Sequence, residues 1–147
     1  MATENKAIDE VLIRGLIEDK IKAVRAKDID GATSNYAPDV LSFDVVNPLQ
    51  NIGLDAIRKR LKEWLSSFQG SIDFDIRDLS ITAGDGVAFC HSLNHVSATK
   101  MDGGELDMWW RETACYRKID DRWIITHQHS SVPFDMKTGK AALDLKP

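Results

Sequence analysis

The sequence contains no run of basic residues longer than Arg58-Lys59-Arg60, and the lack of a longer one argues against a nucleic-acid-binding protein. Its 147 residues include 19 Lys and Arg against 23 Asp and Glu, giving a formal net charge of -4, and the two signs are interspersed. It also lacks an apolar run long enough to span a bilayer, and its first residues lack the apolar core of a signal peptide. We therefore expect no nucleic-acid partner, no membrane association and a cytoplasmic location.

Cysteine is scarce as well. Cys90 and Cys115 both fall inside expected strands, which favours buried free thiols over a disulfide. Serine-nucleophile, phosphate-loop and zinc-ribbon signatures are absent, since neither Gly84-Asp85-Gly86 nor Gly103-Gly104 matches a phosphate-binding motif. What remains is an ordinary globular composition, 43% hydrophobic and 29% charged. It predicts a single domain over residues 1-147.

The first half of the chain predicts three helices and a short strand. Apolar residues recur at helical spacing over 8–27, and the turn residues after them introduce a shorter helix that ends near Tyr36. Residues 40–46 read as a strand. A third amphipathic helix begins after Gly53 and stops at Gly70.

The second half predicts strands joined by tight turns, at residues 72–83, 87–99, 105–119 and 123–132. Four consecutive strands of this kind form an antiparallel meander. Helices segregated from such a sheet indicate the α+β class. Residues 133–147 are expected to form a C-terminal arm, whose apolar residues could pack on a neighbouring subunit.

The last expected strand carries two histidines on a largely apolar face. Side chains alternate along a strand, so strict alternation places Trp123, Ile125, His127, His129 and Ser131 together. A face that begins as core and ends in ionisable groups suggests a pocket that is closed at one end and polar at its mouth.

Three segments carry a family resemblance: Ala26 to Gly31 after the first helix, Tyr36 to Val40, and Trp123 to Ser131. With the order of elements, they resemble the SnoaL-like branch of the nuclear transport factor 2-like superfamily. The resemblance implies a cone-shaped fold, with three N-terminal helices packed in a curved antiparallel sheet around a deep pocket, and frequent dimerisation through the outer sheet face. The last segment is also similar to the association domain of calcium/calmodulin-dependent kinase II, an assembly module. Such a fold hosts many activities, so function depends on the site.

Ketosteroid isomerases of this superfamily place a catalytic aspartate on the first short strand, and Asp44 stands at the matching position. Their oxyanion tyrosine would fall near Lys20, and their protonated aspartic acid near Glu112 or Thr113. Because these residue types differ, the resemblance does not predict steroid isomerisation. Asp44 itself is open to two interpretations, a general base or a turn cap.

The candidate site follows from strand alternation and from the resemblance. The catalytic candidates are Asp44 as acid/base with three polarising or anchoring groups, His91, Arg111 and His129. The ligand-binding candidates are Phe43, Trp64, Trp109, Thr113 and His127. The histidines could instead be packing residues, and a metal site is the minority interpretation, so no metal or cofactor is predicted.

The sequence thus predicts a pocket protein for a small organic ligand. Its reaction would be that of a cofactor-independent isomerase, dehydratase or cyclase acting on a carbonyl-containing substrate. The alternative is a noncatalytic ligand-binding or oligomerisation module. Since Trp109 and Trp110 point to opposite faces, one of them is expected outside, where it would mark a homodimer contact.

Overall fold

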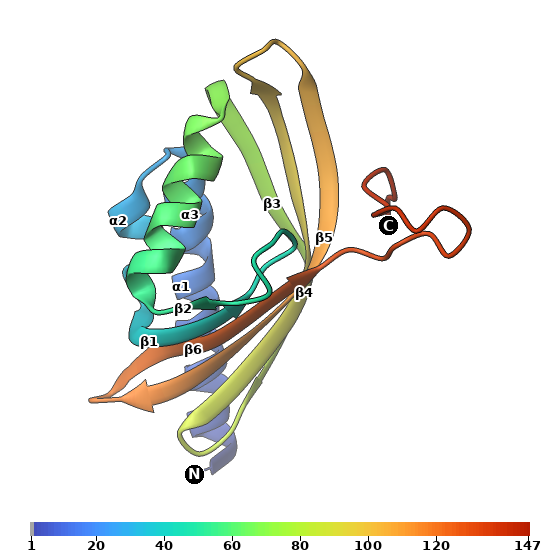
Figure 1. Ribbon diagram of the computed structural model, residues 1–147. Coiled ribbons are helices and arrows are strands. Elements are labelled where there is room, and N and C mark those ends of the chain that lie inside the picture. The colour runs from blue at the N-terminus through green and yellow to red at the C-terminus, as the bar shows by residue number, and fades with distance from the viewer. Residues whose placement is uncertain (1) are drawn as a thin grey trace.

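The computed structural model describes residues 2–147, with side chains from residue 5 onward, as one layer of helices held against a curved sheet (Figure 1). The elements, in chain order, are α1 Ala2–Arg25, α2 Ile29–Ala32, β1 Tyr36–Phe43, β2 Asn51–Ile52, α3 Leu54–Ser66, β3 Phe68–Ala83, β4 Val87–Lys100, β5 Glu105–Ile119 and β6 Arg122–Ser131. None of the helices in this part of the chain combines the length and apolar character needed to cross a membrane.

Helix α1 lies along the concave side of the sheet because its apolar residues form one stripe. Ile13, Ile17 and Val24 on this stripe are buried. The chain then reverses at Asp28, whose carboxylate accepts a hydrogen bond from the backbone N–H of Gly31 at 3.0 Å. Helix α2 is shorter than expected and ends at Ala32, so β1 begins at Tyr36 instead of residue 40.

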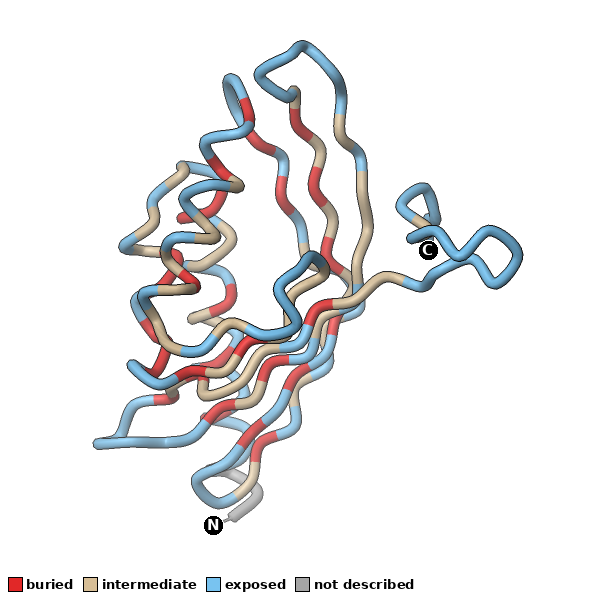
Figure 2. The backbone as a smooth tube through the Cα atoms, in the orientation of Figure 1, coloured by how far each residue is buried: buried red, intermediate tan, exposed pale blue. Residues whose placement is uncertain are grey.

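The six strands form one sheet in the order β2-β1-β6-β5-β4-β3. Strands β3 to β6 are the expected antiparallel meander, whereas β1 pairs with β6 in parallel, so the sheet is mixed. The expected α+β class and cone-shaped arrangement are confirmed. The sheet curls around α1 and α3, and buried positions alternate along its strands (Figure 2).

Two clusters of buried apolar residues fill the cone at opposite ends. One surrounds Ile13, Val40 and Trp123, and the other surrounds Leu65 and Phe68. Between these clusters the concave side of the sheet is not filled by apolar side chains. The site described below occupies this middle region.

Residues 132–147 leave the end of β6 and project from the body of the molecule (Figure 1). The arm is closed by its own backbone hydrogen bonds, including Asp135 N to Lys140 O and Ala142 N to Pro133 O, and by a bridge between Phe134 and Ala141. Its apolar side chains are exposed, with Met136 85% accessible. The arm therefore has an ordered shape that owes little to the domain core.

Candidate functional site

A β-bulge in β6 decides which side chains enter the cone. Cys115 pairs with His127, but the next residue of β5, Tyr116, pairs with Ile125, so Thr126 is an extra residue in β6. The bulge reverses the alternation: Trp123 and Ile125 point into the core, whereas beyond it Gln128 and Ser130 point inward. His127 and His129 therefore point outward.

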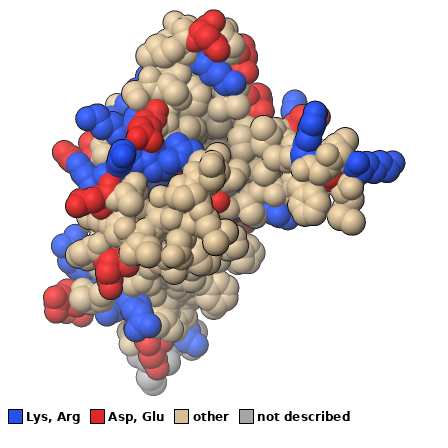
Figure 3. Space-filling view, in the orientation of Figure 1, with Lys and Arg blue, Asp and Glu red and all other residues tan. Residues whose placement is uncertain are grey.

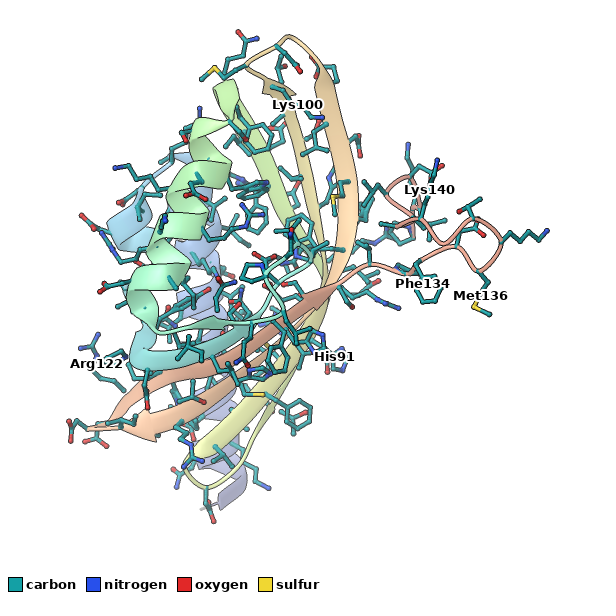
Figure 4. The ribbon with its side chains drawn as sticks, in the orientation of Figure 1. His91, Lys100, Arg122, Phe134, Met136 and Lys140 are labelled. Carbon is teal, nitrogen blue, oxygen red and sulfur yellow. The ribbon has the colours of Figure 1, made fainter. Side chains whose placement is uncertain are left out.

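The expected convergence of Asp44, His91, Arg111 and His129 on one cavity is wrong. His91, Thr113 and His129 stand opposite one another on adjacent strands, and this row lies on the outer face. Figure 4 shows His91 on that side of the sheet. The predicted residues placed on the outer face are Phe43, His91, Trp109, Arg111, Thr113, His127 and His129. On β4 and β5, the side chains that face the cavity are one residue along from the predicted ones, and they include Asn94 and Glu112.

The outer face has its own network of polar and aromatic contacts. His127 Nδ1 lies 2.8 Å from the carbonyl oxygen of Leu41, and the Phe43 ring meets the His127 ring edge-on. His95 contacts Asp107 at 2.8 Å and stacks on Trp109 with ring centroids 4.4 Å apart. All four histidines of the chain therefore lie on this face. None of them lines the cavity.

The cavity lies between α1, α3 and the concave side of the sheet, and its volume is about 310 Å³. Of the predicted residues, Asp44 and Trp64 line it. Its walls are largely apolar and include Ile57, Leu61, Phe74, Val96, Met108 and Trp110. Charged side chains gather over α2, α3 and the C-terminal arm, while the surface between them is largely uncharged (Figure 3).

The first polar group in the cavity joins α1 to the sheet. The ammonium of Lys20 donates hydrogen bonds to the Tyr36 hydroxyl and, at 3.3 Å, to Gln128 Oε1. The Tyr36 hydroxyl in turn donates to the same Gln128 oxygen at 2.5 Å. Two donors thus lie side by side at the floor of the cavity.

The second polar group is built around Glu112. Its Oε2 accepts a hydrogen bond from Asn94 Nδ2 at 2.5 Å, and its Oε1 accepts one from the Ser130 hydroxyl at 3.2 Å. The Ser92 hydroxyl donates to Asn94 Oδ1 at 2.7 Å, which fixes the orientation of the amide. These contacts hold the Glu112 carboxylate at the cavity wall.

Burial and charge set the protonation of the Lys20 and Tyr36 pair. Burial acts to lower the pKa of Lys20, but Tyr36 and the Glu112 carboxylate outweigh it, so the pKa lies above the ordinary value. Burial raises the pKa of Tyr36, and Lys20 offsets this only in part. At neutral pH the pair is therefore an ammonium beside a neutral phenol, a strong hydrogen-bond donor set.

Asp44 lies near the mouth of the cavity, beyond the end of β1. Phe43 pairs with His129, so Asp44 follows on the inner side next to Ser130. Its Oδ2 lies 3.1 Å from Arg60 Nε of α3, and its Oδ1 accepts the Val45 backbone N–H at 2.6 Å. The contact with Arg60 is an ion pair without hydrogen-bond alignment. Among the described residues, Arg60 Nε is accordingly buried with no hydrogen-bond partner, which leaves a donor for a ligand.

The site therefore combines an apolar wall, two carboxylates and three cationic or neutral donors. Lys20, Tyr36, Glu112 and Gln128 were not predicted as site residues. Two signals were available. Lys20 continues the buried stripe of α1, where a cation needs a polar partner inside the fold. The resemblance also placed Lys20 and Glu112 near the positions of the isomerases' oxyanion residues. Within residues 2–147 no three His, Cys, Asp or Glu side chains cluster closely enough to hold a metal ion.

Comparison with known proteins places the chain in a family. A family model described as a SnoaL-like domain matches residues 13–135, so the chain belongs to the SnoaL-like family. It is similar over 100% of its length to a nuclear transport factor 2-like protein of unknown function from Pseudomonas putida KT2440, at 34% identity, with 99% of that chain covered and a TM-score of 0.85. The nuclear transport factor 2-like fold is thereby confirmed.

More distant structures share the fold alone. A candidate dehydratase from Streptomyces avermitilis is 13% identical over 86% of this chain and 97% of its own, with a TM-score of 0.75. A candidate calcium/calmodulin-dependent protein kinase II association domain from Xanthomonas campestris is 21% identical over 81% and 84% of the two chains, with a TM-score of 0.69. No curated protein sequence matches the chain.

Proposed function

We propose that the protein is a cofactor-independent isomerase or lyase that moves a proton on a small, largely apolar carbonyl compound. The observation that carries this proposal is the pairing, within one apolar cavity, of a carboxylate with the Lys20 and Tyr36 donors. A carboxylate can accept a proton from the carbon next to a carbonyl, while donors stabilise the charge that develops on the oxygen. The three groups line the same cavity.

Asp44 is the proposed proton acceptor. It takes the proton from the carbon atom next to the carbonyl, and the carbon–hydrogen electron pair forms the enolate. The enolate oxygen accepts hydrogen bonds from Lys20 and from the Tyr36 hydroxyl, which turns its proton from Gln128 to the substrate. Return of the proton to another carbon gives an isomer. Loss of a hydroxyl group from the next carbon, with the proton that Asp44 has taken, gives water and an alkene conjugated to the carbonyl. Arg60 holds Asp44 in place and offers its free Nε–H to a second oxygen of the substrate.

Exchange of protons for deuterons tests the first step without knowledge of the substrate. We expect the protein to catalyse exchange of the protons next to the carbonyl of 2-heptanone in D₂O, measured by NMR. Asp44→Asn should reduce this rate about a hundredfold, and Tyr36→Phe should reduce it by about the same factor. Asp39→Asn, on an exposed position of the same strand, is the matched control.

Two outcomes would contradict the proposal. A folded Asp44→Asn protein that exchanges at the wild-type rate eliminates Asp44 as the base. A wild-type protein that binds ketones without exchanging any proton favours the alternative, a noncatalytic binding or assembly module. Native mass spectrometry of the purified protein would show whether an organic ligand is retained.

A further inference from the structure

The cavity continues toward a second hollow at the far end of the cone. Trp64 of α3 and Leu106 of β5 line both the cavity and a shallow depression that is also bordered by Phe68 and Met101. Lys100, in Figure 4, marks this end of the molecule. Two side chains therefore form the partition between the hollows.

The partition consists of side chains held between fixed backbones. The Trp64 ring meets Trp110 of β5 edge-on, with ring centroids 6.1 Å apart, so it reaches from the helix toward the strand. At the end of the cone the backbone N–H of Met101 donates to the carbonyl of Ser67 at 3.0 Å, which ties the β4–β5 turn to the end of α3. A passage can therefore open by side-chain rotation alone.

Polar side chains give way to apolar ones along the route from the floor of the cavity to the partition. The depression beyond the partition is also bordered by Lys100 and Asp102. Lys20, Tyr36 and Glu112 surround the polar end, whereas Val96, Met108 and Leu106 lead toward the partition. Beyond it lie Phe68 and Met101, the latter 64% exposed. The Met101 thioether suits an unbranched hydrocarbon chain, because methionine is flexible and adapts to an irregular apolar surface.

We propose that the ligand carries an unbranched apolar chain that passes between Trp64 and Leu106 and ends against Met101. This inference rests on the proposed function in one respect, that the carbonyl head binds at Lys20 and Tyr36. Trp64 and Leu106 then determine the chain length that the protein accepts. Such a ligand matches the cavity wall, since its one polar group meets the polar floor and its chain follows the apolar side chains to the partition.

Calorimetric binding of linear methyl ketones, from 2-butanone to 2-undecanone, tests the proposal. Each added methylene should raise the affinity about fourfold while it becomes buried. Met101→Glu should lower the affinity for the long ketones about tenfold or more and leave the affinity for the short ones unchanged, because only long chains reach the depression. In Leu106→Trp, the affinity should stop rising at a shorter ketone chain than in the wild-type protein. Met136→Glu, on the exposed arm, is the matched control and should change nothing.

The outcomes separate this inference from the proposed function. The inference is overturned if Met101→Glu binds the long ketones as tightly as the wild-type protein does. This test stands even if Leu106→Trp fails to fold, because Met101 is exposed and tolerates a charge. Chain-length selectivity without proton exchange supports the inference and contradicts the proposed function. Proton exchange without chain-length selectivity supports the proposed function and contradicts the inference. Failure of every ketone in the series to bind contradicts both.

Discussion

Lys20 of α1 donates a hydrogen bond to the hydroxyl of Tyr36 at the start of β1, and the two residues share Gln128 Oε1 as acceptor. Their contact joins the helix to the parallel edge of the meander at the floor of the cavity. The Glu112 charge raises the pKa of both groups and burial raises that of Tyr36, so the ammonium and the neutral phenol keep their protons above the pH at which the free groups lose them.

The two tyrosines of the chain, Tyr36 and Tyr116, should not ionise near pH 10 while the protein is folded. Burial raises the pKa of both phenols above their ordinary value of 10.0. A raised folded-state pKa contributes stability that is complete below pH 10 and is lost as the pH rises above it, because the unfolded chain releases protons first. We expect tyrosinate absorbance to appear together with loss of circular dichroism. Titration at an ordinary pKa in a folded sample would contradict the burial of both rings.

Lys20→Met should lower the free energy of unfolding by about 2 kcal/mol, because it leaves the Tyr36 hydroxyl and the Glu112 carboxylate without their cation. Urea denaturation followed by tryptophan fluorescence measures this. The double variant Lys20→Met with Glu112→Gln should lose less than the two single variants together. Lys22→Met, at an exposed position of the same helix, is the control. Equal stability of the Lys20 and Lys22 variants would refute the coupling.

Asp9 is a buried carboxylate that accepts a hydrogen bond from Trp123 Nε1 at 3.1 Å and pairs with Lys118 at 3.4 Å. Asp9→Ala should reduce stability by about 2 kcal/mol, because the indole N–H would remain buried without an acceptor. Asp9→Asn keeps an oxygen that can accept the indole N–H and should therefore reduce stability less than Asp9→Ala does. Thermal unfolding compares both with Glu10→Ala, an exposed neighbour. If Asp9→Ala matches that control, the hydrogen bond contributes nothing to the fold.

We expect a homodimer that buries the outer sheet face. Phe89 is 47% exposed there, on the same face as the stacked pair of His95 and Trp109. Phe89→Glu should convert the dimer to a monomer, measured by multi-angle light scattering. Leu49→Glu, on an equally apolar but separate loop position that is 95% exposed, should leave the mass unchanged. A monomeric wild-type protein at micromolar concentration would refute the expectation.

The elements were predictable because their periodicities are strong. The expected strands 87–99 and 105–119 differ from β4 and β5 by one residue at most, since Gly-containing turns delimit them. The segment around α2 was predicted less accurately: the helix was expected to end near Tyr36, but it ends at Ala32, and Tyr36 pairs with Ile125 and starts β1. Local sequence does not contain that long-range pairing.

Placement within the cavity was predictable for Asp44 from the family resemblance and for Trp64 from the apolar stripe of α3. It failed on β4 to β6 for a physical reason. Along β4 both faces mix polar and apolar residues, for example Asn94 inside and Leu93 outside, so alternation alone does not identify the inner face. On β6 the extra residue Thr126 reverses the pattern, and a bulge of this kind has no sequence signature here.

The Thr126 bulge also selects between two surfaces that the same sequence could present. Gln128 and Ser130 stand inside and His127 and His129 stand outside because one extra residue is accommodated between Ile125 and His127. Deletion of Thr126 would leave His127 opposite Cys115 in a regular ladder, so the inner side chains would stay the same. Straightening of the strand with Thr126 retained would instead turn two imidazoles into the cavity in place of the carboxamide and the hydroxyl.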